Sequence, residues 1–341
     1  MLRLPPFDFH TPGSFAEVIE ILDGEGPETR VVAGGTDLWP NMKRRHQKAE
    51  RVVSLMAIPE LAGIEGHNGE LWVGSTTILD DIVRSREITE RFPALARAVA
   101  SISSPPLRKM GTIGGNICVD TRCNYYNQTE EWRRSIDYCM KEEGTICWVA
   151  PSSPRCWAHS ASDSAPVLCA LGARVELVSK RGSRALPLTD FYRDDGIDYL
   201  DKAADEVVTK ILIPTESDNT HCRSSFWKLR RRGSIDFAVL SVAAVVWTDG
   251  GDRVTEARVY LGAVGSRPLQ VAGLADYLQG KTLSEEVISE AATLARKTAT
   301  PMDNTDFQAQ WRGVMAAKYT EAALREIAGL DPRGLPPQHL L

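Results

Sequence analysis

Seven cysteines are distributed unevenly along this chain of 341 residues. Four of them, Cys123, Cys139, Cys147 and Cys156, fall within 34 residues, where an even spread would place about 0.7. Four thiolates can hold a [4Fe–4S] cluster or a zinc ion, and this spacing lacks the paired C-x2-C knuckles typical of a zinc ribbon. The alternative is four ordinary buried cysteines. We interpret the three cysteines outside the window as structural; these are Cys118, Cys169 and Cys222.

Two glycine pairs are candidates for contacts with a phosphate. The first pair lies in Ala33-Gly34-Gly35-Thr36-Asp37, and the second in Thr112-Ile113-Gly114-Gly115-Asn116. Paired glycines let backbone N–H groups converge on an anion with no Cβ in the way. Neither segment fits a P-loop or the G-x-G-x-x-G fingerprint, so a Rossmann site is not supported. By itself, each pair fits a tight turn better than a phosphate site.

Hydrophobic periodicity indicates the elements that must position these residues. In the first part of the chain, strands are expected at 30–33, 51–55, 71–74 and 174–178, and helices at 15–23, 78–92, 94–102 and 165–171. Further on, strands at 226–229, 239–248 and 255–261 precede helices at 270–279, 284–299 and 307–328. Strands followed by helices predict an α+β unit at the C-terminal end.

Residues 120–158 interrupt this pattern, because they are polar, aromatic and rich in cysteine, without a sustained period. A structureless loop of this length is unusual in a compact domain unless something orders it. We therefore interpret the segment as an insertion organised by a metal. Its aromatic side chains are best explained as a small apolar core, and His159 as a loop residue rather than a ligand.

Length and charge limit the classes of function. A chain of 341 residues predicts two or three domains. The net charge of −5 and the pI of about 5.8 argue against nucleic acid or an anionic membrane as the main partner. No apolar run approaches the roughly 20 residues of a membrane span. The N-terminal residues lack the features of a signal peptide, so we expect a cytoplasmic protein.

Taken together, the two glycine segments and Ser162-Asp163 resemble the FAD-binding subunit of the xanthine dehydrogenase and carbon monoxide dehydrogenase family. The resemblance continues through 211–214, 228–232, 236–238 and 262–264, and covers nearly the whole chain. It implies an α+β fold with a two-subdomain FAD-binding domain of the PCMH or vanillyl-alcohol-oxidase type. The implied boundaries are 1–60 and 61–217 for the two subdomains, with the iron–sulfur insertion at 120–158, and 218–330 for a C-terminal α+β domain.

The resemblance also implies roles for individual residues. The glycine segments would hold the FAD pyrophosphate between the two subdomains, Asp163 would contact the cofactor, and Lys228 would lie near the flavin ring. Without the resemblance, Asp163 would be interpreted as a helix cap and Lys228 as a solvated strand residue. The expected cofactor contacts are therefore Ala33, Gly34, Gly35, Thr36, Asp37, Thr112, Ile113, Gly114, Gly115, Asn116, Ser162, Asp163 and Lys228.

The cysteine window is similar to the insertion in the FAD subunit of 4-hydroxybenzoyl-CoA reductase, which binds a [4Fe–4S] cluster. This implies an electron-transfer subunit that works beside a molybdenum-cofactor large subunit and a [2Fe–2S] small subunit, often as a dimer of heterotrimers. A ferredoxin is a candidate donor. Electrons would run through the cluster and FAD to the partner chains, where the ring hydroxyl is removed.

Two alternatives remain open at this point. One is the flavin subunit of an oxidative molybdenum hydroxylase, in which electrons flow the other way. The other is a free-standing flavoprotein with a structural zinc. No nucleophile–His–acid triad and no molybdopterin site is recognisable in the sequence, so we expect the organic substrate to bind to a partner chain.

Overall fold

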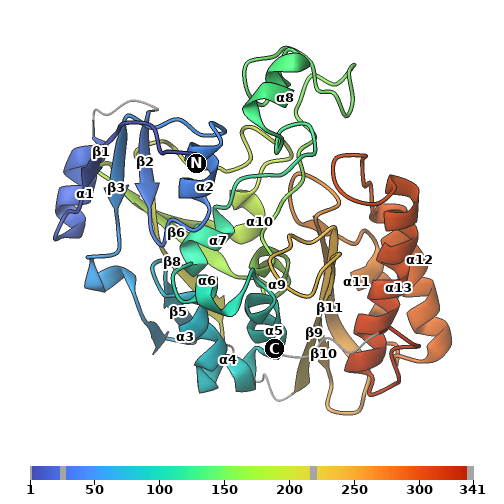
Figure 1. Ribbon diagram of the computed structural model, residues 1–341. Coiled ribbons are helices and arrows are strands. Elements are labelled where there is room, and N and C mark those ends of the chain that lie inside the picture. Colours follow the sequence, from blue (N-terminus) through green and yellow to red (C-terminus); the bar gives the residue numbers. More distant parts are fainter. Residues whose placement is uncertain (1, 24–27, 216–220, 336–341) are drawn as a thin grey trace.

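The computed structural model describes residues 2–23, 28–215 and 221–335. Within these residues the strands form three sheets, which follow one another across the molecule from the N-terminal to the C-terminal part of the chain (Figure 1). Every sheet is accompanied by helices, as the α+β class predicted from the sequence requires. The predicted boundary at 217 lies outside the described residues.

The first sheet is parallel and has the strand order β1 (Asp8–His10), β3 (Arg51–Ser54) and β2 (Thr29–Val32). Helices α1 (Phe15–Leu22) and α2 (Leu38–Lys43) belong to the same unit. Ser14 caps α1, whose buried Val18 and Leu22 pack with Val53. Because parallel strands end at one edge of a sheet, β2 delivers residues 33–37 to the edge where ligands commonly bind.

The second sheet has the order β4 (Ile64–His67), β5 (Glu70–Gly74), β8 (Val207–Pro214), β6 (Arg174–Ser179) and β7 (Gly182–Pro187), with antiparallel neighbours. The helix predicted over 78–92 is divided at Ser85, which caps the second of the two pieces. The elements of this unit are η1 (Pro59–Leu61), α3 (Leu79–Arg84), α4 (Arg86–Arg91), α5 (Pro93–Ala100), α6 (Pro105–Arg108), α7 (Ile113–Ile117), α9 (Ser164–Ala170) and α10 (Leu188–Phe191).

The third sheet is antiparallel and has the order β12 (Leu269–Gln270), β11 (Val254–Gly262), β10 (Leu240–Thr248) and β9 (Cys222–Leu229). It packs against α13 (Ala309–Ile327) and α11 (Leu274–Leu278), with α12 (Glu285–Thr298) beside α13 (Figure 1). Helices α5 and α9 of the second unit also contact this sheet. The third unit is therefore held against the second by buried apolar side chains such as Phe226 and Val245.

The insertion projects from one end of the molecule, where α8 (Glu130–Ser135) is its helix (Figure 1). It has a small core of its own, in which Tyr126 and Ala158 pack with Cys123, Cys139 and Cys156. Among the described residues, no helix is long and apolar enough to cross a membrane.

Glu326 joins the second and third units. Its carboxylate accepts two hydrogen bonds from Arg97 on α5, at 2.7 and 2.8 Å, one from Ser225 Oγ, and one from the Trp227 indole at 2.9 Å. Burial acts to raise the pKa of Glu326, but these donors together hold it below the ordinary value of 4.5. The carboxylate therefore contributes its full stabilisation above about pH 4.5 and loses it as the pH falls through the lower folded-state pKa.

We expect Glu326→Gln to lower the free energy of unfolding by about 1–3 kcal/mol at pH 7, because hydrogen bonds to a charged group are replaced by weaker ones. The difference from the parent chain should shrink as the pH falls below 4.5. Urea unfolding at several pH values measures both effects. Glu290→Gln, at an exposed position of α12, is the matched control and should change little. A loss that does not depend on pH would contradict this role of the charge.

Candidate functional site

The first glycine segment presents free backbone donors at the end of β2. Gly35 has φ +68°, which a residue with a Cβ rarely adopts. Within the described part of the chain, the N–H groups of Gly34, Gly35 and Thr36 have no hydrogen-bond acceptor. Successive N–H groups beside a left-handed residue form a concave site for an anion. The segment therefore has the geometry of a phosphate cradle.

The second glycine segment differs, because its N–H groups are already bonded within the protein. Ile113 and Gly114 donate to the carbonyl oxygens of Thr77 (3.0 Å) and Ser75 (2.9 Å), and Gly115 donates to Thr112 Oγ1 (3.1 Å). A Cβ on Gly114 would lie 2.7 Å from the Ser75 carbonyl oxygen. In this segment glycine permits the close packing of α7, which was not expected from the sequence.

The two glycine segments lie against each other. A Cβ on Gly34 would lie 1.7 Å from the Met110 carbonyl oxygen, and one on Gly111 would lie 3.4 Å from Thr36 Oγ1. Only glycine at position 34 allows this approach, because the clashing atom belongs to the backbone and cannot rotate away. The phosphate cradle after β2 is therefore positioned by direct contact with the second segment.

Asn116 connects the second segment to the third one predicted. Its side-chain oxygen accepts hydrogen bonds from Ser162 Oγ (2.9 Å) and Ser164 Oγ (2.6 Å). Asp163 lies between these serines but does not cap α9 with its side chain. The three segments, which are distant in the sequence, thus form one continuous site.

Asp163 and Lys228 form a buried ion pair, with 2.6 Å between Oδ2 and Nζ. Lys228 also donates to the Ser101 carbonyl at 3.1 Å. Burial raises the pKa of Asp163 and lowers that of Lys228, and each partner opposes the shift of the other. Asp163 occupies the N-cap position of α9, but its carboxylate pairs with Lys228 and does not bond a backbone N–H of the helix. The interpretation of Lys228 as a solvated residue is wrong, since its side chain is 1% exposed.

The second carboxylate oxygen of Asp163, Oδ1, is buried and has no hydrogen-bond partner among the described residues. Leaving such an acceptor unpaired costs about 1–3 kcal/mol. A bound molecule with an N–H or O–H group would satisfy it. The anion cradle and this free acceptor fit a cofactor that has a pyrophosphate at one place and a hydrogen-bond donor at another.

Asp37, the last residue of the first segment, contacts the insertion. Its carboxylate forms an ion pair with Arg122 and accepts a hydrogen bond from Asn41 at 2.8 Å. Burial raises the pKa of Asp37, while the charge of Arg122 acts to lower it. The Arg122 guanidinium also lies 4.4 Å from the Phe237 ring centroid. This role of Arg122 was not predicted from the sequence, although the residue directly precedes the candidate metal ligand Cys123.

The four clustered cysteines are brought together by the fold. Each is buried, with 4–7% of its surface exposed. Within the described residues, no group of three or more His, Cys, Asp or Glu side chains is arranged to hold a single metal ion. In a [4Fe–4S] cluster each thiolate binds a different iron atom, so its ligands lie further apart than those of one zinc ion.

Backbone N–H groups donate to three of these thiols, as is common where a protein stabilises thiolate ligands. Burial raises the pKa of Cys123 to about 12 and that of Cys156 to about 11, and these N–H groups act to lower it. The thiols of Cys123 and Cys156 would therefore stay protonated at neutral pH unless a metal displaced the protons. The donor and acceptor pairs are Tyr125 and Tyr126 with Cys123, Lys141 with Cys139, and Ala158 with Cys156.

The cysteines outside the insertion lie elsewhere. Cys169 is buried on α9 in the core of the second unit, Cys118 packs against the same core, and Cys222 begins β9. No cysteine is in a disulfide. His159 is buried, and its Nδ1 lies 2.9 Å from the Ser160 carbonyl oxygen. Burial lowers the pKa of His159 to about 4.

The C-terminal unit supports the insertion through Asn304. Its backbone carbonyl accepts from the N–H of Asn124 at 2.8 Å, and its side-chain amide donates to the Trp157 carbonyl at 2.6 Å. These two residues directly follow Cys123 and Cys156. Asn304 in turn lies beside Arg312, which is fully buried on α13 and donates to three backbone carbonyls.

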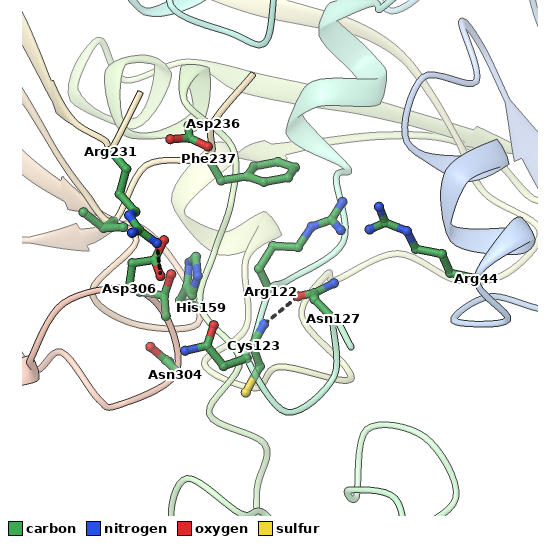
Figure 2. Close-up of a pocket in the computed structure, with 13 residues that line it drawn as sticks. Arg44, Arg122, Cys123, Asn127, His159, Arg231, Asp236, Phe237, Asn304 and Asp306 are labelled. Carbon is green, nitrogen blue, oxygen red and sulfur yellow. Dashed lines mark hydrogen bonds and ion pairs between the residues drawn. The ribbon is translucent and has the colours of Figure 1, made fainter. Parts of the chain in front are cut away.

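A cavity of about 220 Å³ lies between the insertion and the C-terminal unit, and residues of both line it (Figure 2). Its lining includes Cys123, His159, Phe237 and Asn304, and in Figure 2 the guanidinium groups of Arg44 and Arg122 point toward each other. A second cavity, of about 410 Å³, is lined by residues that include Pro59, Thr77 and Ile78. Ile78 forms a β-bridge with Thr112, but no residue of the glycine segments lines this cavity.

Two family models together match most of the chain. Residues 5–216 match the FAD binding domain in molybdopterin dehydrogenase. Residues 224–327 match the CO dehydrogenase flavoprotein C-terminal domain. The first match covers more than half of the chain and therefore identifies the family. The second match covers the C-terminal unit, so the order of the two matched domains follows the order of the units in the structure.

Known proteins resemble the chain over nearly its full length. The carbon monoxide dehydrogenase medium chain of Hydrogenophaga pseudoflava is 26% identical over 94% of this chain and 96% of its own. The nicotinate dehydrogenase FAD-subunit of Eubacterium barkeri is 25% identical over 87% of each. In fold, a crystal structure of Cu,Mo-CO dehydrogenase has a TM-score of 0.79 at 24% identity, covering 96% of this chain and 99% of that one.

Proposed function

Because the chain belongs to the family of FAD-binding subunits of the molybdenum hydroxylases, we propose that it relays electrons between FAD and a [4Fe–4S] cluster and leaves substrate chemistry to a partner. FAD can take up electrons in pairs and pass them on singly, and the cluster exchanges one at a time. The observation that carries the proposal is the buried group of four thiols beside the flavin-binding segments.

We assign the FAD pyrophosphate to the N–H groups of residues 33–37, which lack acceptors within the described chain. Met110 and Gly111, directly before residues 112–116, would hold this cradle in place. Ser162, beside Asp163, donates a hydrogen bond to Asn116. The free Oδ1 of Asp163 would accept a hydrogen bond from the cofactor, and Lys228 would keep that carboxylate ionised. In this way the chain binds and orients FAD without taking part in bond making.

We assign the [4Fe–4S] cluster to Cys123, Cys139, Cys147 and Cys156. Support comes from their joint burial, from the N–H donors to their thiols, and from spacing similar to that of the 4-hydroxybenzoyl-CoA reductase insertion. On this basis the complete enzyme would be a reductase of that type, which removes a ring hydroxyl from an aromatic acyl-CoA. Since no single-ion site is found in the described chain, no observation favours a structural zinc.

The partners would be a molybdenum-cofactor large subunit and a [2Fe–2S] small subunit, paired as a dimer of heterotrimers, with a ferredoxin as the donor. Several similar proteins are named as medium chains or as subunits of larger enzymes, which supports an assembly of this kind. The same names favour a second candidate, because these relatives are dehydrogenases. In that case electrons would flow from the molybdenum centre toward FAD.

The test is anaerobic purification of the native complex, with flavin and metal analysis of every subunit. We expect FAD and iron on this chain, and no turnover of 4-hydroxybenzoyl-CoA by this chain alone, although artificial acceptors should still oxidise its reduced flavin. The whole complex, reduced by dithionite, should dehydroxylate the thioester. Dehydroxylation by the isolated chain would overturn the subunit assignment. Oxidation of a substrate by the complex, without reductive turnover, would favour the second candidate.

A further inference from the structure

Lys141 is a buried cation within the cysteine insertion. Its side chain is 6% exposed, and its ammonium pairs with Asp120 at 2.7 Å. It also donates to Thr121 Oγ1 (2.8 Å) and to the Gly196 carbonyl (2.5 Å). Lysine is rarely buried so completely unless its charge is used or compensated. No motif in the amino-acid sequence distinguishes this lysine from the other charged residues of the insertion.

The position of Lys141 connects it to Cys139 and Cys156. It lies two residues after Cys139, whose thiol accepts its backbone N–H. Its partner Gly196 touches Cys156, since a Cβ there would lie 2.6 Å from that sulfur and its N–H donates to the Cys156 carbonyl at 3.0 Å. The ammonium is also 5.0 Å from the ring centroid of Tyr126, which packs with the cysteines.

Lys141 is the member of the ion pair whose charge favours negative charge on the sulfur atoms. It opposes the rise in pKa that burial causes at Cys139 and Cys156. The charge of Asp120 acts in the opposite sense, and adds to the rise in pKa that burial causes at Tyr126 and at Asp37.

We propose that Lys141 is a positioning residue that raises the reduction potential of the cysteine-bound cluster relative to that of the flavin. This inference rests on the proposed function. One electron added at a site with four thiolates increases its negative charge by one unit. A buried ammonium nearby favours that reduced state, and the low polarity of the interior keeps water and salt from screening the effect.

The test compares reduction potentials of the full chain with its cluster, titrated anaerobically with dithionite and followed by electron paramagnetic resonance. Lys141→Met should shift the equilibrium constant for one-electron reduction at least about tenfold toward the oxidised state, which corresponds to about 59 mV. Lys141→Arg should restore most of the parent value, because the charge is kept. Lys141→Met combined with Asp120→Asn removes both charges and should give a smaller shift in the same direction.

Lys48→Met is the matched control. Lys48 also pairs with a residue of the insertion, Glu143, at 2.9 Å, but the two side chains are 69% and 56% exposed. Solvent should screen that charge, so the potential should not move. If Lys141→Met does not fold, the double variant carries the test, because it leaves no unpaired buried carboxylate.

The outcomes separate this inference from the proposed function. A parent chain without iron would overturn the proposed function, and this inference with it. An iron-containing chain whose potential is the same in the parent, the Lys141→Met variant and the double variant would overturn this inference alone. The inference would also be overturned if Lys141→Met shifted the reduction potential no more than Lys48→Met does. That result would show that burial of the lysine charge has no effect on the potential.

Discussion

Changing Cys139 to Ser is expected to remove all of the roughly four irons bound per chain, because a [4Fe–4S] cluster requires four thiolate ligands. The thiol is buried with the other three, and no other cysteine lies in the insertion. Iron analysis and anaerobic spectroscopy measure the loss. Much of the FAD should remain bound, since the segments that we propose to bind FAD lie on either side of the insertion rather than within it.

Loss of the cluster should loosen the insertion without unfolding it. Metal–thiolate bonds offset part of the ordering cost of about 1–2 kcal/mol per residue. The remaining contacts include the Arg133–Glu142 ion pair and the hydrogen bonds of Asn304. Hydrogen exchange across residues 120–158 should therefore increase, while α9 and β10 stay protected.

Cys169→Ser and Cys118→Ser are the controls, because both residues lie in or against the core of the second unit. Neither change should remove iron, although the buried Cys169 variant should be less stable. Zinc in place of iron would keep the four ligands and exclude the electron relay through this loop. Iron retained in the Cys139 variant would show that the ligand assignment is wrong.

Changing Gly34 to Val is expected to give a chain almost free of flavin. The new Cβ would overlap the Met110 carbonyl oxygen, 1.7 Å away, so the two glycine segments would have to separate. The phosphate cradle would then lose its support, and the affinity for FAD should fall at least about tenfold. A tenfold loss corresponds to about 1.4 kcal/mol of lost binding free energy. Absorbance of the purified chain and titration with FAD measure the effect.

Gly66→Val is the matched control, because a Cβ on Gly66 has no atom within 4 Å and Gly66 lies in strand β4. Its flavin content should equal that of the parent chain. We also expect Gly35→Val to lose FAD, since the left-handed backbone at φ +68° is strained for valine. Full flavin occupancy in both the Gly34 and Gly35 variants would place the pyrophosphate elsewhere.

Much of the secondary structure could be predicted because it is encoded locally. The alternation of apolar residues predicted strands at 51–55 and 239–248, observed at Arg51–Ser54 and Leu240–Thr248. The long helix at 307–328 was found at Ala309–Ile327. Strands β1 and β7 were not predicted, because the first is three residues long and the second is mostly exposed. Such strands are specified by their neighbours in the sheet.

The candidate site was predictable to a similar degree. Its glycine segments and crowded cysteines are visible as residue types at given positions, and the family they indicated is the one to which the chain belongs. The close packing of Gly114 could not be predicted, because Ser75, against which it packs, is 39 residues away in the sequence. The predicted iron–sulfur cluster and the assignment of individual contacts remain predictions.

The sequence alone determined which groups are available: paired glycines that can bend the backbone, and four thiols in a segment with no apolar period. Only the tertiary structure decided the electrostatics. Lys228 and Lys141 look like ordinary surface cations in the sequence, yet they pair with Asp163 and Asp120 at 2.6 and 2.7 Å in the interior. The physical reason is that burial of a charge depends on what the rest of the chain places around it, and these contacts join residues far apart along the chain.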